Sequence, residues 1–321
     1  MTSNIKVSVI IAAYEAADFI AAAITACLAQ TETSIEVIIV DDASAQSLEP
    51  AVSAAANGDP RVRFLRQDQN SGPSGARNRA LEEARGTYVA ILDADDSMHP
   101  DRLETLLRAA EAHGADIIVD NMIADRIDAA ANGADEPFLT PQAIPGDHEI
   151  DLETYMDPRT SAVFGQPLGY LKPLIRRQFL LDTGLDYDTS LTNSEDYYLI
   201  AELLARRAKM ILIPYMGYRY TIQAGSISHR LNPRQTAAII AAEQAFQNRH
   251  RSSFSATARG AANRRLTQIK RDHQFETLIE DLRRRSIFGF TNHLFANLTN
   301  APGHILKLMA IAMTKLGRIG R

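Results

Sequence analysis

The chain has 321 residues, of which 45% are hydrophobic and 23% charged, as in an ordinary globular protein. Its single cysteine, Cys27, excludes an internal disulfide and a cysteine-based zinc site. We find no secretory leader and no run of 18 apolar residues, so we expect a cytoplasmic protein. The net charge of −5 combines an acidic body (residues 1–229, 18 Lys and Arg against 34 Asp and Glu) with a basic end (residues 230–321, 16 against 5).

The first half of the chain alternates strand and helix patterns. Short apolar runs predict strands at residues 7–11, 36–40, 61–65, 88–92 and 116–119. Apolar residues at helical spacing predict helices at 19–28, 74–84 and 100–113, the last with Pro100 in its first turn. Because the strands are apolar along almost their whole length, we expect an α/β fold with a mostly parallel sheet and helices on both faces.

The second half is less regular. Residues 124–151 hold three prolines and two glycines among several acids, which predicts a long surface excursion. A helix is predicted at 195–207, with Asn193 or Ser194 as its N-cap, and strands at 209–214 and 216–222. Beyond Pro233 the chain looks helical and basic, and residues 305–319 place apolar side chains on one helical face. We therefore divide the chain into an α/β domain, 1–230, and a basic helical region, 231–321.

The most informative segment is the acidic turn after the predicted strand 88–92. Asp93, Asp95 and Asp96 end a buried strand, at the edge where open α/β sheets collect ligands. Three carboxylates within four residues repel one another unless they share a cation, and oxygen ligands favour Mg²⁺ or Mn²⁺. Such an ion would stabilise a diphosphate as a leaving group. The alternative is a solvated acidic turn that caps the next helix.

Two further segments have polar residues suited to a nucleotide. Asp41 and Asp42 also end a strand, where an acid suits a ribose hydroxyl or a base N–H; the alternative is a simple turn with Ser44. In the glycine-rich turn that follows, Ser74 would cap a helix and Arg77 would lie in its first turn. A cation there opposes the helix dipole, which points to an external anion such as phosphate. The alternative is a salt bridge from Arg77 to Asp41 or Asp42.

Two polar segments lie further along the chain. Glu195 and Asp196 open a helix, where acids are ordinary partners of the dipole. A loop after the last predicted strand offers hydroxyls, an imidazole and a guanidinium as a lid over phosphates, from Ser226, Ser228, His229 and Arg230. For His229 alone, a plain surface histidine is the alternative.

Taken in this order, the segments resemble the family 2 inverting glycosyltransferases, which have the GT-A fold. The match comprises residues 7–14, 39–44, 72–80, 92–96, 195–196 and 226–230, so it covers about the first 230 residues. The narrower resemblance is to bacterial enzymes that build exopolysaccharide repeat units on lipid carriers, such as the succinoglycan type. The Gln-x-x-Arg-Trp motif of processive synthases is absent and the chain has no Trp, which favours transfer of a single sugar.

The resemblance implies a nucleotide-sugar donor, with a UDP-sugar favoured. Ala12 and Tyr14 would line the base pocket, although two alanines replace the polar residues often found before this Tyr. Asp42 would hold the uracil or other base, with Asp41 nearby. The remaining donor contacts would come from Arg77, from Asp93 against the ribose with Ala94 beside it, and from Ser226, Ser228 and Arg230.

The resemblance also implies the reactive groups. Asp196 would be the general base, with Glu195 as its neighbour in the same motif. Asp95 would bind the metal ion, Mg²⁺ or Mn²⁺, through the diphosphate, and His229 would be a further metal ligand or a diphosphate donor.

Two other activities were weighed. A nucleotidyltransferase would show a glycine-rich loop with Lys or Arg after the first strand, which residues 12–15 lack. A non-catalytic nucleotide-sugar-binding scaffold predicts the loss of Asp95 or Asp196, yet both are present.

The expected partners follow from the same resemblance and from the charge distribution. The acceptor would be a glycan or a lipid-linked saccharide, and we expect no nucleic acid. The basic end is a candidate for contact with anionic lipid at the inner face of the cell membrane, and the alternative is a helical lid or a homodimer contact.

Overall fold

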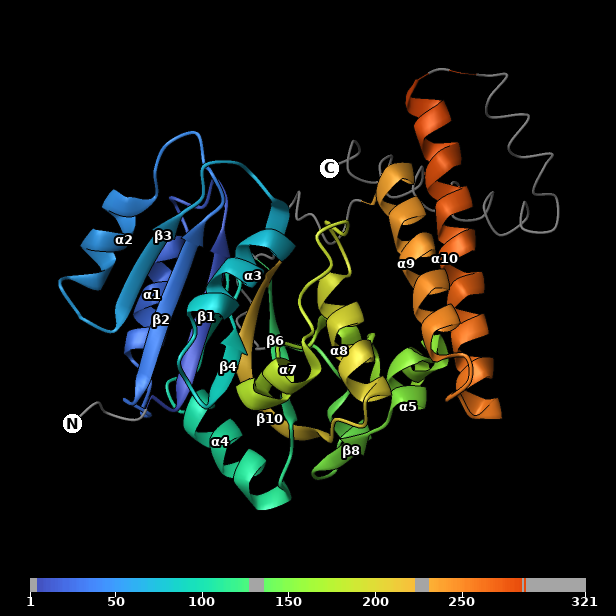
Figure 1. Cartoon of the computed structure of the whole chain (residues 1–321), viewed down its shortest axis with the longest axis horizontal. Coiled ribbons are helices and arrows are strands. Elements are labelled where there is room, and N and C mark those ends of the chain that lie inside the picture. Colours follow the sequence, from blue (N-terminus) through green and yellow to red (C-terminus); the bar gives the residue numbers. More distant parts are fainter. Residues whose placement is uncertain (1–4, 127–135, 223–230, 285, 287–321) are drawn as a thin grey trace, which may run out of the picture.

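The computed structural model describes residues 5–126, 136–222, 231–284 and 286 (Figure 1). Its strands are β1 (Val7–Ala13), β2 (Ile35–Asp41), β3 (Val62–Arg66), β4 (Tyr88–Ile91), β5 (Ser97–Met98), β6 (Ile117–Arg126), β7 (Glu136–Pro137), β8 (His148–Ile150), β9 (Leu174–Arg176) and β10 (Met210–Ile222). In the described residues they form one ten-stranded sheet in the order β3-β2-β1-β4-β9-β6-β10-β5, with β7 beside β6 and β8 beside β10. The strands β5, β7, β8 and β9 are antiparallel to their neighbours, and the others are parallel to one another. The predicted mostly parallel α/β fold with a helical C-terminal region is confirmed.

Helices connect the strands. The α-helices are α1 (Ile20–Leu28), α2 (Glu49–Ala56), α3 (Gly72–Glu83), α4 (Arg102–His113), α5 (Leu152–Met156), α6 (Ser161–Phe164), α7 (Arg177–Thr183), α8 (Glu195–Ala205), α9 (Pro233–His250) and α10 (Ala256–Arg283). Short 3₁₀ turns are η1 (Pro141–Ala143), η2 (Pro158–Thr160) and η3 (Leu168–Tyr170).

Helices cover both faces of the sheet. Because successive side chains of a strand point to opposite faces, each central strand contributes to the packing on both sides. On β1, Val9 and Ile11 belong to the main core, together with buried residues of α1, α2 and α4. Ile10, between them, packs in a second cluster with Ala76 and Ala80 of α3. The strands are therefore buried on both sides, which is why they read as continuous apolar runs.

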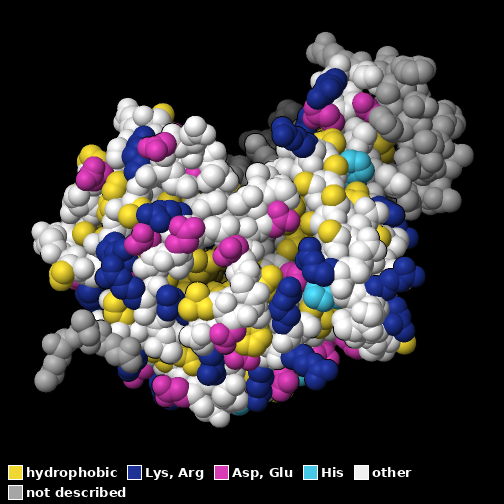
Figure 2. All heavy atoms as spheres, viewed as in Figure 1, with side chains coloured by type: hydrophobic (Ala, Val, Ile, Leu, Met, Phe, Trp, Pro, Cys, Tyr) yellow, Lys and Arg dark blue, Asp and Glu magenta, His cyan; other side chains and the backbone are white. Residues whose placement is uncertain are grey.

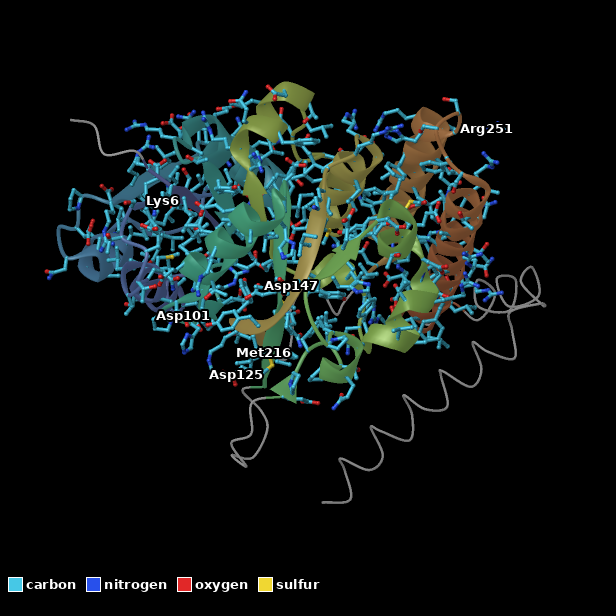
Figure 3. All side chains as sticks on the ribbon, turned by 90° about the horizontal axis from the view of Figure 1, so that it is seen from below. Lys6, Asp101, Asp125, Asp147, Met216 and Arg251 are labelled. Atoms are coloured by element: carbon cyan, nitrogen blue, oxygen red, sulfur yellow. The ribbon has the colours of Figure 1, made fainter. Side chains whose placement is uncertain are left out.

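The helices α9 and α10 form a long hairpin at the end of the molecule opposite β1, as the positions of Lys6 and Arg251 show (Figure 3). A capping box between Asn232 and Gln235 starts α9. Phe246 and Ile269 of the hairpin belong to the same core as the sheet. The predicted boundary at 230/231 adjoins residues 223–230, which the structure does not describe, and it stays a prediction. In the described part of the chain, no helix has the length and apolarity needed to cross a bilayer.

Two element predictions were wrong. The strands expected at 209–214 and 216–222 are one strand, β10, whose register against β6 shifts on either side of Met216. Bulges of this kind accommodate a proline such as Pro214 within a strand. The excursion expected at 124–151 contributes to the fold, because β6 continues to Arg126 and because Leu139 and Ile150 are buried. Residues 127–135 lie outside the described residues.

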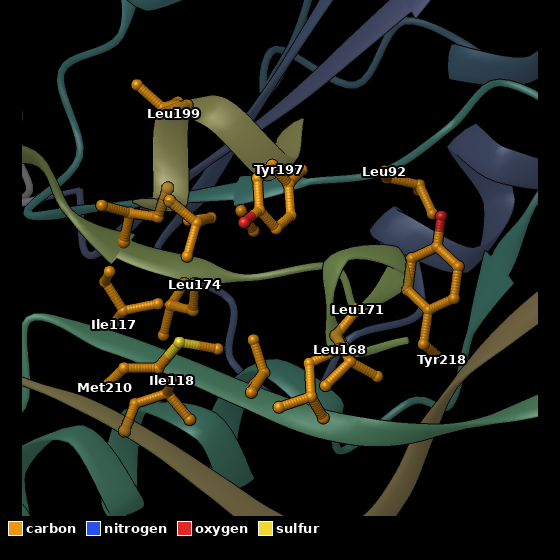
Figure 4. Close-up of a cluster of buried hydrophobic side chains, with 14 of the residues drawn as sticks. Leu92, Ile117, Ile118, Leu168, Leu171, Leu174, Tyr197, Leu199, Met210 and Tyr218 are labelled. Carbon is orange, nitrogen blue, oxygen red and sulfur yellow. The ribbon is translucent and has the colours of Figure 1, made fainter. Parts of the chain in front are cut away.

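A buried cluster supports the region where the acidic turn lies (Figure 4). Leu92 follows β4, Tyr197 comes from α8 and Tyr218 from β10, and all three are at most 5% exposed. The Tyr218 ring lies below Leu92, and its hydroxyl accepts a hydrogen bond from the backbone N–H of Asp93 at 3.1 Å. The core therefore fixes the backbone of the turn that carries Asp93, Asp95 and Asp96.

Candidate active site

A cleft of about 1240 Å³ opens at the carboxyl ends of the parallel strands and reaches the α9–α10 hairpin. In the space-filling view, the surface is hollowed between the α/β part of the molecule and the α9–α10 hairpin (Figure 2). Segments far apart in the sequence supply its walls, and the predicted site residues among them are Ala12, Tyr14, Asp42, Arg77, Asp93, Ala94, Asp95, Glu195 and Asp196. The structure therefore brings together nearly every predicted site residue that it describes, with Asp41 as the exception.

The three carboxylates of the acidic turn differ in their surroundings. Asp95 is exposed in the cleft, and its carboxylate forms no ion pair with the described residues. Its partial burial and the charge of Asp93 raise the pKa of Asp95. Asp96 is 2% exposed and accepts hydrogen bonds from the Tyr218 hydroxyl at 2.6 Å and the Thr221 N–H at 2.8 Å. Burial and the charges of Asp93 and Asp95 raise the pKa of Asp96 to about 8. Asp95 is thus the carboxylate open to a cation, and Asp96 anchors the turn to β10.

The two acids at the end of β2, Asp41 in the strand and Asp42 directly after it, also have different roles. Asp42 lines the cleft, and its Oδ1 accepts hydrogen bonds from the Gln67 side chain and from the N–H and hydroxyl of Ser71. These contacts hold the Asp42 carboxylate at the floor of the cleft. Asp41 is fully buried and does not line the cleft. Its carboxylate holds the following loop by pairing with Arg66 at 2.7 Å and by accepting from the Leu48 N–H at 3.2 Å.

The Arg77 side chain pairs with carboxylates that line the cleft. Its guanidinium donates to Glu195 at 2.6 Å and to Asp93 at 2.8 Å, and it lies 3.5 Å from Asp196. The salt bridge to Asp41 or Asp42 does not form. The dipole argument was also wrong, because α3 begins at Gly72 and Arg77 therefore lies in its second turn.

One predicted helix cap and one predicted helix start were wrong. Ser74 lies inside α3, and its hydroxyl donates to the Leu191 carbonyl. Ser194 occupies the N-cap position of α8, as predicted, with φ +66° and without a hydrogen bond from its side chain to the helix. The helix predicted from Pro100 begins two residues later, at Arg102.

Asp196 lies between two cations at the start of α8. Its Oδ2 accepts a hydrogen bond from Lys172 Nζ at 3.0 Å, and its Oδ1 is buried without a hydrogen bond among the described residues. Burial alone would raise the pKa of Asp196, but Arg77 and Lys172 outweigh it and hold the pKa below its usual value. The helix N-terminus favours the charged carboxylate as well. Asp196 is therefore ionised at neutral pH, as a general base must be.

Lys172 is a site residue that the sequence analysis missed. It is 8% exposed, lines the cleft and forms a second ion pair with Asp93 at 2.7 Å. The only signal in the sequence was a lysine inside the apolar run Tyr-Leu-Lys-Pro-Leu-Ile, just before β9. A buried lysine needs a partner, so its position could have marked it.

The loop predicted as a lid lies outside the described residues, and the roles of Ser226, Ser228, His229 and Arg230 stay predictions. Among the residues that are described, no group of three His, Cys, Asp or Glu side chains could hold a metal ion. The open carboxylate of Asp95 fits a divalent cation whose other ligands come largely from elsewhere, such as the oxygens of a diphosphate.

Comparisons with known proteins agree with this geometry. Residues 8–165 match glycosyl transferase family 2. Succinoglycan biosynthesis protein ExoO of Rhizobium meliloti is 36% identical over 283 residues, which cover 88% of this chain and 79% of that protein. S. aureus TarS 1-349 in complex with UDP-GlcNAc has a TM-score of 0.60 at 18% identity, covering 90% of each chain. The mannosyltransferase PcManGT of Pyrobaculum calidifontis, in complex with GDP-Man and Mn²⁺, has a TM-score of 0.57 at 15% identity, covering 99% of this chain and 83% of that one.

The cleft and the fold therefore belong to a GT-A glycosyltransferase. The chain is a member of glycosyl transferase family 2, similar to proteins of succinoglycan biosynthesis. This membership decides between the three activities weighed for the sequence in favour of glycosyl transfer.

Proposed function

We propose that this chain transfers one sugar from a nucleoside-diphosphate donor to an acceptor hydroxyl, with inversion at the anomeric carbon, in the synthesis of a bacterial exopolysaccharide. The observation that carries the proposal is the shared cleft, in which Asp42, Asp95 and Asp196 meet although they are far apart in the sequence. The similarity to a protein of succinoglycan biosynthesis supports the glycan class.

The donor would lie along the wall formed by β1, β2 and β4. The base would contact Ala12, Tyr14 and the Asp42 carboxylate, and the ribose would lie against Asp93. The complexes of TarS with UDP-GlcNAc and of PcManGT with GDP-Man support a nucleotide-sugar donor. A UDP-sugar is our preferred donor class, in keeping with the family resemblance.

A divalent cation, Mg²⁺ or Mn²⁺, held at Asp95 would supply positive charge to the leaving diphosphate. Among the chain's own residues, Asp196 is proposed to accept a proton. It takes the proton of the acceptor hydroxyl as the hydroxyl oxygen attacks the anomeric carbon and the bond from that carbon to the diphosphate oxygen breaks. Attack from the face opposite the leaving group inverts the configuration.

The acceptor is proposed to be a glycan or a lipid-linked saccharide, with the enzyme at the cytoplasmic face of the membrane. The basic end supports this placement, since Lys307, Lys315 and Arg318 accompany an apolar helical face in the sequence.

The test is turnover of defined donors. The purified chain with Mn²⁺ and a lipid-linked saccharide acceptor would be incubated with UDP-glucose, UDP-galactose, UDP-N-acetylglucosamine and GDP-mannose, and the release of nucleoside diphosphate would be measured. Proton NMR of the glycosidic product from an α-linked donor would show a β linkage. No release from any donor, or a product that keeps the α configuration, would contradict the proposal.

A further inference from the structure

Beyond the groups already assigned a role, the cleft contains a buried lysine, Lys172, that contacts both Asp93 and Asp196. Lys172 Nζ lies 2.7 Å from Asp93 Oδ2 and 3.0 Å from Asp196 Oδ2. A single ammonium group therefore joins the carboxylate proposed to face the donor ribose to the carboxylate proposed as the base. We propose that Lys172 is a positioning residue of the transfer reaction, which fixes the Asp196 carboxylate relative to the bound donor. This inference rests on the proposed function.

The backbone at Lys172 is held by a buried ion pair. Its carbonyl accepts a hydrogen bond from Arg102 Nη2 at 2.6 Å. Arg102 is fully buried and forms a bidentate pair with Asp120, which is also fully buried. The guanidinium of Arg102 lies 5.0 Å from the centre of the Tyr218 ring, whose hydroxyl contacts both Asp93 N and Asp96. One frame thus fixes both the backbone of Lys172 and the acidic turn, which leaves the ammonium little freedom to move.

Charge compensation alone is a weaker explanation of this arrangement. Burying a lysine among carboxylates is costly, and replacing buried ion pairs by apolar side chains often does not reduce stability. Arg77 already contacts Asp93, Glu195 and Asp196. What Lys172 adds is a contact with Asp196 Oδ2, whereas Arg77 lies near Oδ1 without a hydrogen bond to it. Lys172 therefore supplies the hydrogen bond to Oδ2 that holds the plane of the carboxylate, and the Tyr187 side chain faces the same carboxylate.

The charged and titratable groups around Asp196 set its pKa and therefore the pH dependence of kcat. The titratable and charged groups that face it come from six parts of the chain and are Arg77, Asp93, Tyr155, Lys172, Tyr187 and Glu195. Burial and neighbouring charges, that of Asp196 among them, raise the pKa of Tyr155 and of Tyr187 well above its usual value, so both tyrosines stay protonated near neutral pH. Removing Lys172 leaves Arg77 as the one cation in contact with Asp196 among the described residues, so the pKa of Asp196 rises.

The first test uses Lys172→Ala in the full chain, with the donor that the wild-type chain turns over. We expect kcat to fall ~100-fold, as for a misplaced catalytic group, while the donor Kd changes less than threefold. The acid limb of the pH profile of kcat should move up by ~1 pH unit. Propylammonium chloride should restore at least tenfold of the lost kcat, and tetramethylammonium chloride, which cannot donate a hydrogen bond, should not. Loss of kcat and donor binding together, with no rescue by the amine, would overturn the inference in favour of a structural role.

The second test separates position from charge. Lys172→Arg keeps the positive charge, so the acid limb should stay in place, but the larger planar group cannot place one nitrogen between the two carboxylates. We expect kcat to fall tenfold or more. Wild-type kcat in this variant would overturn the inference.

The matched control is Lys209→Ala. Lys209 is partly buried, donates to the His113 carbonyl at 2.8 Å and lies at the opposite, amino end of β10, away from the cleft. Its kinetics should equal those of the wild-type chain. Failure of the inference is distinguishable from failure of the proposed function, since the first requires an active wild-type chain with unaffected Lys172 variants. An inactive wild-type chain contradicts the proposed function and, with it, the role of Lys172.

Discussion

Arg77 and Glu195 form a buried ion pair of 2.6 Å across 118 positions of the sequence. The pair joins α3, which follows the glycine-rich turn, to the first residue of α8. The same guanidinium reaches Asp93 after β4. Arg77 therefore links three segments that line the cleft, namely α3, the acidic turn after β4 and the start of α8.

We predict that Arg77→Met destabilises the protein strongly. The substitution removes one cation from three mostly buried carboxylates, and breaking a buried pair in this way costs ~3–5 kcal/mol. Urea denaturation of the two chains measures the difference in the free energy of unfolding. Arg79→Met is the control, because Arg79 lies on the same helix but pairs with Glu82 and Glu83 at the surface. That variant should lose less than ~1 kcal/mol. Equal stabilities of the two variants would contradict the role of Arg77.

Removal of divalent metal ions should abolish activity. With excess EDTA we expect no release of nucleoside diphosphate, and Mn²⁺ or Mg²⁺ should restore it. Asp95→Asn should show the same loss in the presence of Mn²⁺, because Asp95 is the open carboxylate of the acidic turn. Asp182→Asn, at an exposed site on α7, should retain full activity. Undiminished turnover in excess chelator would rule out an essential metal.

The folded state should lose stability as the pH rises, in part because of Asp96. Its pKa is about 8 in the folded chain, above the ordinary value of 3.8, so between these values the folded state binds more protons than the unfolded state. The protonation equilibrium of Asp96 therefore reduces the free energy of unfolding by up to ~1 kcal/mol per pH unit as the pH rises from about pH 4 to pH 8. In metal-free buffer, Asp96→Asn should remove it. Parallel stability curves for the two chains across this range would show that Asp96 is not the source.

The basic end should bind anionic vesicles. We expect the full chain to float with vesicles that contain phosphatidylglycerol at low salt and to be released as salt increases. Replacing Lys307, Lys315 and Arg318 by Gln should weaken binding at least tenfold, since each contributes ~1 kcal/mol near an anionic surface. If both chains float equally, or neither floats, the membrane proposal is wrong.

The fold and the donor-side wall were accessible from the sequence because they depend on local patterns. Apolar runs marked the parallel strands, and the acids that follow β2 and β4 had to meet at one edge of the sheet. The strand pattern did not show which of Asp41 and Asp42 faces the cleft. Neighbouring residues of a strand point to opposite sides, and which of them faces the cleft depends on the packing of the following loop.

What the sequence could not supply were contacts between distant segments. Lys172 has no motif around it, and its pairing with Asp93 and Asp196 follows from the placement of β9 between β4 and β6. The predicted position of Arg77 in the first turn was wrong because the start of α3 was placed two residues late. A shift of that size moves a side chain from the first turn of a helix to the second, where the dipole argument no longer applies.

The most direct measurement compares donor affinity and turnover in Asp196→Asn. Isothermal titration with the donor in the presence of Mn²⁺ should give a Kd within threefold of the wild-type value, because Asp196 is assigned no contact that holds the nucleotide. Turnover should fall by ~10²–10⁴, the usual contribution of a general base. Wild-type turnover in this variant would contradict the assignment of Asp196 and, with it, the proposed mechanism.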